Sequence, residues 1–315
     1  LRELGFGKPD IMPVGAVFSQ RASPKQNELH MGRSPICISL LLMLAIGHQS
    51  SGSEEEASAP AQRTLVVFCA MGDVPYAPRE DALLPRQIAN FPGDTEFVVH
   101  VGDIKDGSTP CSQAVCIKVA GMLAKSKPPV FITPGDNEWN DCARPGEAWE
   151  FWKRHFSRFD MRWKHRFGVK RQTVRDENFA FVREGVLFVG INIVGGRVHD
   201  ATEWKRRHEQ NLEWIRAQTR RAEDSTSSMV VFGHAHPNIN HKSFFDEFAK
   251  DAVKYARPIL YLHGDGHRWL RDRPFAAKNI LRIQVDQGGI APPLKVTVTN
   301  HATEPFVFDR RKNEK

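Results

Sequence analysis

The sequence lacks any apolar run of the roughly 18 residues that a transmembrane helix needs, which excludes a protein that crosses a membrane many times. It has no excess of Gly (23 residues) or Pro (20), and 41% of its 315 residues are hydrophobic, so a collagen-like or disordered chain is excluded. There is no G-x-x-x-x-G-K-S/T loop and no G-x-S-x-G turn. Nucleotide hydrolysis at a Walker site and serine-esterase chemistry therefore find no support.

The first part of the chain has the pattern of a processed leader. Residues 1–30 show no pattern and are interpreted as translated upstream sequence. Residues 31–47 begin Met-Gly-Arg and continue into an apolar run with small residues at its end, which predicts a secretory signal peptide. A Ser/Glu/Ala/Pro linker follows at 48–63. A buried strand or helix and a short signal anchor remain alternatives for 31–47. We expect a secreted or periplasmic protein with no stable membrane insertion after cleavage.

From residue 64 onward, short β-branched runs alternate with amphipathic segments, which is typical of an α/β domain. A hairpin expected over 179–191 brings antiparallel pairing into the sheet. We predict one domain at 64–300 and a polar tail at 301–315. The strands expected from buried apolar runs are 65–70, 97–101, 130–133, 229–232 and 259–262, with later strands near 280–285 and 294–299.

Polar groups stand at the ends of these buried strands. They come in five motifs: Gly72-Asp73-Val74-Pro75-Tyr76, Gly102-Asp103, Pro134-Gly135-Asp136-Asn137-Glu138, Gly233-His234-Ala235-His236, and His263-Gly264-Asp265-Gly266-His267. The carboxyl ends of strands in α/β sheets form the crevice where ligands bind. Carboxylate, amide and imidazole groups without cysteine suit divalent ions such as Mn, Fe, Mg or Zn. Each motif alone is a weak signal, but the ordered set predicts a site for two ions.

These motifs resemble those of the calcineurin-like metallophosphoesterase superfamily, which are D-x-H, G-D, G-N-H-E/D, a single H after a strand, and G-H-x-H. The resemblance covers about 64–270. It implies an α/β fold in which two packed mixed β-sheets are flanked by helices, an α-β-β-α sandwich. It also implies a hydrolase of phosphomonoesters or phosphodiesters, in which two divalent ions share a bridging hydroxide and clamp the developing charge. The expected partner is a small phosphorylated substrate.

The resemblance also implies a role for each motif residue. Asp73 would bind the first ion and Asp103 would bridge both. Asp136 would stand in for the metal-binding Asn of the family, although Asn137 itself is the alternative ligand. The order of strands and helices along the chain matches His234 to the family's single-His motif, with His236 as a second candidate ligand. The same order matches residues 264–267 to the terminal motif. The implied metal ligands are Asp73, Asp103, Asp136, Asn137, His234, Asp265 and His267, and the implied catalytic residues are Asp103, Asn137 and His234.

Three positions depart from the family pattern. Pro75 stands where D-x-H has its His, and Asp265 replaces the first His of G-H-x-H. Asn137 stands where the family has a His that contacts the scissile phosphate, and an amide can donate a hydrogen bond but cannot shuttle a proton. Because of these departures, the alternative function is a catalytically impaired member of the fold that binds anionic ligands.

Two further features carry predictions. The segment 153–171 combines eight Lys or Arg with aromatic residues. We interpret it as a solvated, partly helical insertion and do not expect nucleic acid as a partner. Removal of 31–47 would leave four cysteines, of which Cys111 and Cys142 both follow site motifs and are the favoured disulfide pair. Cys69 lies inside a strand and is expected to be free, whereas Cys116 is not assigned.

Overall fold

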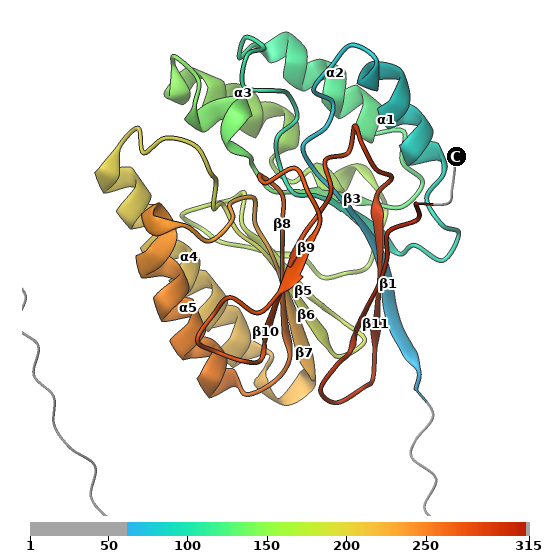
Figure 1. Ribbon diagram of the computed structural model, residues 1–315, viewed down its shortest axis with the longest axis vertical. Coiled ribbons are helices and arrows are strands. Elements are labelled where there is room, and N and C mark those ends of the chain that lie inside the picture. Colours follow the sequence, from blue (N-terminus) through green and yellow to red (C-terminus); the bar gives the residue numbers. More distant parts are fainter. Residues whose placement is uncertain (1–61, 313–315) are drawn as a thin grey trace, which may run out of the picture. The chain divides into compact units, whose positions relative to one another are not determined.

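The computed structural model describes residues 62–312 (Figure 1). The predictions for 1–30 and for a signal peptide at 31–47 lie outside the described residues, as does nearly all of the predicted linker. Within 62–312, no helix combines the length and the apolar character that crossing a membrane requires.

Buried apolar runs form a first, five-stranded sheet with the order β12-β11-β1-β2-β3. β1, β2 and β3 are parallel, while β11 is antiparallel to β1 and β12 is antiparallel to β11. The strands are β1 (Thr64–Met71), β2 (Phe97–His100), β3 (Val130–Ile132), β11 (Leu294–Thr299) and β12 (Phe306–Asp309).

A second, seven-stranded sheet has the order β4-β5-β6-β7-β8-β10-β9. β6, β7, β8 and β10 are parallel, and the predicted hairpin is confirmed as the antiparallel pair β5–β6. The strands are β4 (Lys170–Arg171), β5 (Phe179–Arg183), β6 (Val186–Gly190), β7 (Ser228–Phe232), β8 (Ile259–His263), β9 (Leu270–Asp272) and β10 (Ile280–Gln284).

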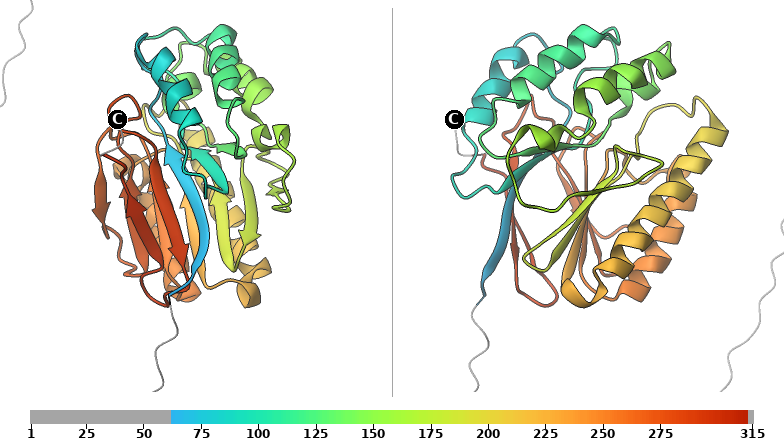
Figure 2. Two further views of the ribbon diagram at one scale, coloured as in Figure 1. Left: turned by 90° about the vertical axis from the view of Figure 1, so that its right-hand side faces the viewer. Right: turned by 180° about the vertical axis from the view of Figure 1, so that it is seen from behind.

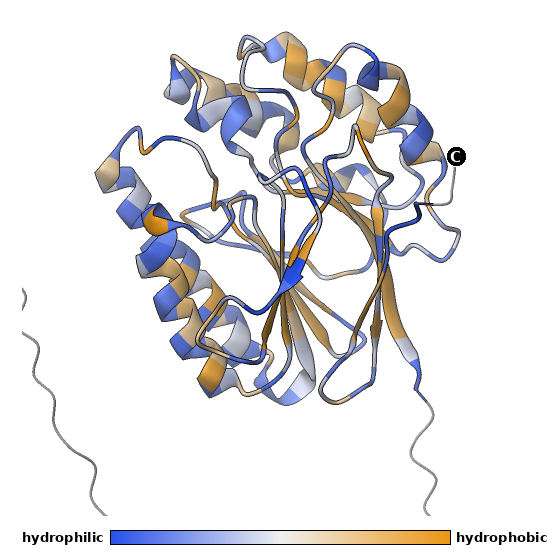
Figure 3. Ribbon diagram, in the orientation of Figure 1, coloured by the Kyte–Doolittle hydropathy of each residue, from blue (hydrophilic) through white to orange (hydrophobic). Residues whose placement is uncertain are grey.

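The two sheets face each other across an aromatic-rich core. Phe68 of β1 stacks on Phe97 of β2 with ring centroids 5.1 Å apart and meets Phe188 of β6 edge-on at 5.7 Å. Hydrophobic residues accordingly concentrate on the strands (Figure 3). Both faces of the inner strands are covered, which explains why their sequences are nearly continuous apolar runs rather than alternating ones.

Helices cover the outer face of each sheet, so the predicted α-β-β-α sandwich is confirmed (Figure 2). On the first sheet lie α1 (Glu80–Ala89), α2 (Gln113–Leu123) and α3 (Pro145–Phe156). On the second lie α4 (Ala201–Arg221) and α5 (Lys242–Tyr255). Four short helices complete this part of the chain: η1 (Asp136–Asn140), η2 (Phe159–Arg162), η3 (Glu223–Ser225) and η4 (Ile239–His241).

The predicted end of the domain at residue 300 is wrong. Part of the segment expected to be a polar tail forms β12, which pairs antiparallel with β11 and extends the first sheet. Phe306 is only 6% exposed and joins the core between the sheets. Burial of this ring and the hydrogen bonds to β11 hold the segment in place, although charged residues surround it in the sequence.

Candidate metal centre

The five sequence motifs meet at one edge of the sandwich. Asp73 follows β1, Asp103 follows β2, His234 follows β7, and both Asp265 and His267 follow β8. The η1 turn after β3 carries Asp136 and Asn137 to the same place. Since β1–β3 and β6–β8 are parallel within their sheets, their carboxyl ends present these loops together.

The backbone at this edge is unusual. Asp73, Asp103, Asp265 and His267 all have positive φ values, of 55°, 59°, 68° and 58°. Residues other than glycine rarely adopt this conformation, and it concentrates at functional sites where the surrounding structure enforces it. Gly135 is required for a different reason, because a Cβ atom there would lie closer than 3.0 Å to the backbone of Asp103. The loops therefore pack backbone against backbone and crowd their side chains into a small space.

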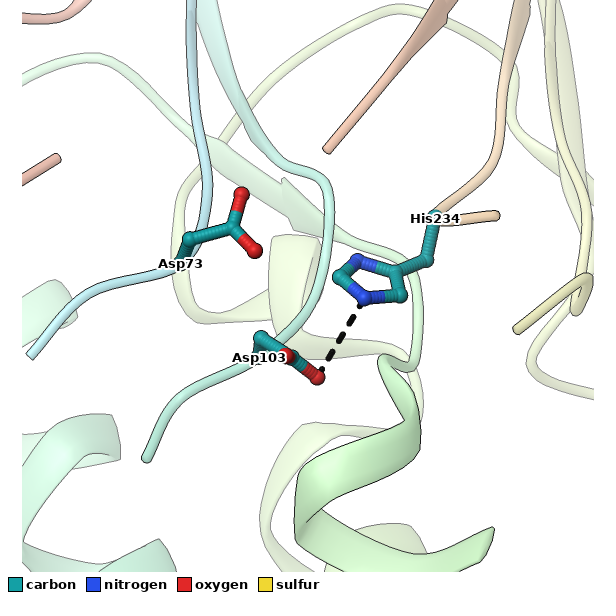
Figure 4. Close-up of side chains that lie close together, drawn as sticks. All are labelled: Asp73, Asp103 and His234. Atoms are coloured by element: carbon teal, nitrogen blue, oxygen red, sulfur yellow. Dashed lines mark ion pairs between the residues drawn. The ribbon is translucent and has the colours of Figure 1, made fainter. Parts of the chain in front are cut away.

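Asp73, Asp103 and His234 form a first group of potential ligands (Figure 4). One ligand atom from each lies within 4.8 Å of the others, and all three residues are buried. The Nδ1 atom of His234 lies 2.8 Å from the carbonyl oxygen of Val101. A carbonyl only accepts, so Nδ1 carries a proton and Nε2 is turned toward the carboxylates, 3.3 Å from Asp103 Oδ1. Metal-binding histidines are commonly oriented by such a bond.

Asp136, His234 and Asp265 form a second group. His234 Nε2 lies 3.0 Å from Asp136 Oδ1. Burial raises the pKa of Asp136 to about 6, and the charge of Asp103 adds to the shift. Burial alone would lower the pKa of His234, but the carboxylates of Asp103 and Asp136 raise it well above the ordinary value. The site therefore concentrates negative charge around one imidazole.

Three buried atoms of this site, Asp73 Oδ2, Asp136 Oδ1 and His234 Nε2, make no well-formed hydrogen bond within the part of the chain that the structure describes, although Asp136 Oδ1 and His234 Nε2 lie 3.0 Å apart as an ion pair. Burying such groups without a partner is costly. A divalent cation would satisfy all three at once, and oxygen and imidazole donors are the ligands that such ions accept. The residues present therefore fit a metal site.

The model of the calcineurin-like phosphoesterase family matches residues 67–269, from within β1 to just beyond His267. The chain belongs to this family. No curated protein matches the chain. Two solved structures are similar at low level: the GAP50 anchor in the inner membrane complex of Plasmodium and the 5'-nucleotidase from Candida albicans. The first has 12% identity, a TM-score of 0.48, and a match over 79% of this chain and 89% of that one. The second has 13% identity, a TM-score of 0.45, and a match over 79% of this chain and about half (52%) of that one.

Asn137, which the resemblance aligns with a family histidine, points its amide nitrogen at Asp103. Its Nδ2 atom lies 2.5 Å from Asp103 Oδ2, and its backbone N–H donates to Asp103 Oδ1 at 3.0 Å. The amide oxygen faces the other way, since a Cβ on Gly107 would lie 3.2 Å from it. The Asp136 carboxylate lies among the potential ligands.

The two histidine-containing motifs meet through Asp265. Its Oδ2 atom is 2.6 Å from His236 Nδ1, and its backbone N–H donates to Asp73 Oδ1 at 3.2 Å. Burial opposes ionisation of Asp265, but His236 and His234 hold its pKa well below the usual range. His267 Nε2 lies 3.4 Å from Asp73 Oδ1, and this contact raises the pKa of His267. Both motifs thus reach the site.

Tyr76 and Glu138 lie closer to the site than their sequence positions suggest. Tyr76 Oη lies inside the cluster, whereas His263 Nδ1 contacts its neighbour's carbonyl, Gly264 O. Glu138, which the sequence did not single out, accepts from Gly135 N at 2.6 Å, and burial raises its pKa to about 8.

The predicted disulfide between Cys111 and Cys142 is confirmed, with Cα atoms 6.0 Å apart. Both sulfur atoms lie 3.6 Å from the carbonyl oxygen of Asn137. Cys69 and Cys116 are free and buried. The disulfide therefore joins the loop after β2 to the turn after β3 where Asn137 meets Asp103.

The basic segment 153–171 is partly helical, as predicted, with the end of α3 followed by η2. Phe156 and Phe159 are buried in the core under the first sheet, so these rings offer no stacking surface. Arg158 is paired with Asp176.

Proposed function

We propose that this member of the calcineurin-like phosphoesterase family is a metal-dependent hydrolase of small phosphomonoesters or phosphodiesters. The observation that carries the proposal is the gathering of the buried carboxylates of Asp73, Asp103 and Asp136 around the His234 imidazole, at the edge where the strand ends meet. A divalent cation would neutralise this concentration of buried negative charge.

Two ions would be held by two sets of residues that share Asp103 as a bridge. Asp73 and His267, 3.4 Å apart, would hold the first, and Asp136, His234 and Asp265 would hold the second. Asp103 suits a bridging role because its two oxygens face different neighbours. Oδ1 is 3.3 Å from His234 Nε2, whereas Oδ2 is 2.6 Å from Tyr76 Oη.

Two divalent ions would supply an activated water and would neutralise charge on the phosphoryl group. The protein's own contribution is positioning. The amide nitrogen of Asn137 would donate a hydrogen bond to a phosphoryl oxygen, but it has no proton to give to a leaving group. We therefore expect substrates with stable leaving groups to react fastest.

The carboxylate at position 265, where the family has a histidine, bears on the choice of metal. Added negative charge weakens the Lewis acidity of bound ions and favours harder ones, so Mn or Mg should support more turnover than Zn. Stronger activation by Zn than by Mn would contradict this part of the proposal.

The test combines metal content with turnover of p-nitrophenyl phosphate and bis-p-nitrophenyl phosphate. Wild-type protein should bind two ions and turn over one of these compounds, whereas Asp103→Ala should lose both properties. Asp246→Ala is the matched control, since Asp246 is exposed and pairs with Lys242 on α5. It should behave like the wild type. Fewer than two ions and no turnover with any divalent metal would instead support the alternative, an impaired family member that binds anionic ligands.

We also propose that the domain is exported and works in an oxidising compartment. The Cys111–Cys142 disulfide supports this, because such bonds persist mainly outside the reducing cytosol. Sequencing the N-terminus of the mature protein tests the proposal. A first residue shortly after residue 47 is expected, and a mature chain that keeps residues 31–47 would contradict it.

A further inference from the structure

A histidine at the end of β2 contacts the loops that carry two of the proposed ligands. His100 is completely buried. Its Nδ1 atom accepts a hydrogen bond from the backbone N–H of Gly102 at 3.2 Å, and its Nε2 atom lies 3.1 Å from the carbonyl oxygen of Val74. Gly102 comes directly before Asp103, and Val74 comes directly after Asp73. One imidazole ring therefore spans both loops.

These contacts fix the tautomer of the ring. A backbone N–H only donates, so the Nδ1 atom of His100 accepts and carries no proton. A carbonyl only accepts, so Nε2 carries the proton and donates it to Val74. Burial lowers the pKa of His100 to about 4, which keeps the ring in this neutral form. Both ring nitrogens are therefore occupied by backbone groups of the two loops.

The backbone conformation of the loops explains why they need this support. Asp73, Gly102 and Asp103 have φ values of 55°, 96° and 59°. For residues other than glycine this conformation is strained and persists only where surrounding contacts enforce it. The ring of His100 bonds to peptide groups next to both strained aspartates. An apolar side chain at position 100 would remove the partner of two buried backbone groups, which is costly.

The backbone of His100 reaches a third loop. Its carbonyl oxygen accepts a hydrogen bond from the backbone N–H of Thr133 at 3.0 Å, just after β3. Thr133 lies three residues before Asp136 in the sequence. This bond does not involve the side chain, so a substitution at position 100 acts directly on the two ring bonds alone.

We propose that His100 is a positioning residue of the metal centre, whose ring holds Asp73 and Asp103 in the arrangement that binds the ions. The inference rests on the proposed function, because it needs a metal at this site. His100 acts through the peptide groups of Val74 and Gly102 and not through a bond to an ion or to substrate. Loss of its ring bonds should raise the Kd for metal about 10–100-fold, the usual range when a group that orients metal ligands is removed.

Two substitutions separate the two ring bonds. The short side chain of His100→Asn can still accept from Gly102 but cannot reach Val74, whereas the longer side chain of His100→Gln can donate to Val74 but loses the bond to Gly102. His100→Asn should therefore weaken mainly the ion beside Asp73. His100→Gln should weaken both ions, because Asp103 would bridge them. Titration of the metal-free proteins with Mn measures both affinities.

His208→Asn is the matched control. His208 is also a buried histidine, but its Nε2 atom contacts the side chain of His241, at 3.0 Å, rather than the backbone of a site loop. This substitution should lower the melting temperature and leave both Mn affinities unchanged. Circular dichroism and thermal unfolding of the metal-free variants control for folding.

A measurement on the wild type keeps the inference testable if the His100 variants do not fold. Amide hydrogen exchange of the metal-free protein reports on the bond from Gly102 to the ring. The Gly102 amide should be protected from exchange before any metal is added, since the ring holds the loop in place. An amide that exchanges freely would overturn the positioning role.

The outcomes separate this inference from the proposed function. A wild type that binds two ions, together with His100 variants that bind them equally tightly, would overturn the positioning role and leave the hydrolase proposal intact. An equal loss of affinity in His208→Asn would also overturn it, because the loss would then reflect general destabilisation. A wild type that binds no ion would overturn both.

Discussion

Replacing Gly135 by alanine tests whether the packing of the loops after β2 and β3 creates the site. A Cβ atom at Gly135 would lie closer than 3.0 Å to the amide nitrogen, Oδ1 and Cα of Asp103. The obstructing atoms are mainly backbone, so they cannot move aside as a flexible side-chain end would. One loop must shift, and Asp103 would move away from its neighbours.

The cost of this substitution follows from the geometry. Forcing an extra methyl group into a tightly packed place typically costs about 1–3 kcal/mol of unfolding free energy. For a domain of this size, each kcal/mol lowers the melting temperature by about 2–4 °C. Because Asp103 would also move, we expect Gly135→Ala to lose metal binding even at temperatures where it is fully folded.

Gly146→Ala provides the matched control. Gly146 lies in the first turn of α3, and nothing lies within 4 Å of the position that a Cβ would occupy. The same chemical change there should be neutral or stabilise by up to about 1 kcal/mol, since alanine favours helix. Thermal unfolding and titration with Mn are the assays. If Gly135→Ala melts like the wild type and binds two ions with unchanged affinity, the packing argument is refuted.

Three other predictions follow from the same site. Asn137→Ala should lower kcat by about 10²–10³-fold and leave the metal content unchanged. This is the usual loss when one hydrogen-bond donor to a developing negative charge is removed. A kcat equal to the wild-type value would argue against this role for Asn137. Reduction of the Cys111–Cys142 disulfide should lower the unfolding free energy by about 2–4 kcal/mol, measured by denaturant titration with and without reductant. The Cys69→Ser variant keeps this disulfide and is the control, so it should lose as much stability on reduction. Burial raises the pKa of Glu138 to about 8, so the folded metal-free protein holds this proton more tightly than the unfolded chain. Its stability should therefore fall as pH rises from about 4.5 to 8, and a Glu138→Gln variant should show a shallower slope, with the remainder due to the raised pKa values of Asp136 and His234.

Much of the fold was predictable because its strands are buried on both faces. Runs such as 65–70 and 229–232 are apolar at nearly every position, and they proved to be the parallel strands that carry the site. β12 escaped prediction because its four residues lie among charged ones and gain stability only from pairing with β11. The residue pattern within such a short segment does not indicate that it will pair with a strand elsewhere in the chain.

The sequence was sufficient to predict which residues gather at the site, since strand ends in α/β sheets converge. It was not sufficient to predict which of these residues contact each other. His236 meets Asp265 across 29 positions of sequence, and Tyr76 meets His267 across 191. These contacts depend on positive φ at Asp265 and His267, a backbone conformation that residues other than glycine seldom adopt and that no motif predicts.

The proposed function requires two ions bound around Asp103. The most direct measurement is anomalous diffraction from crystals of the protein grown with Mn. Two peaks about 3.5–4 Å apart are expected, one beside Asp73 and His267 and one beside Asp136 and His234, with Asp103 contacting both. A single peak, or none, would overturn the proposed two-ion site.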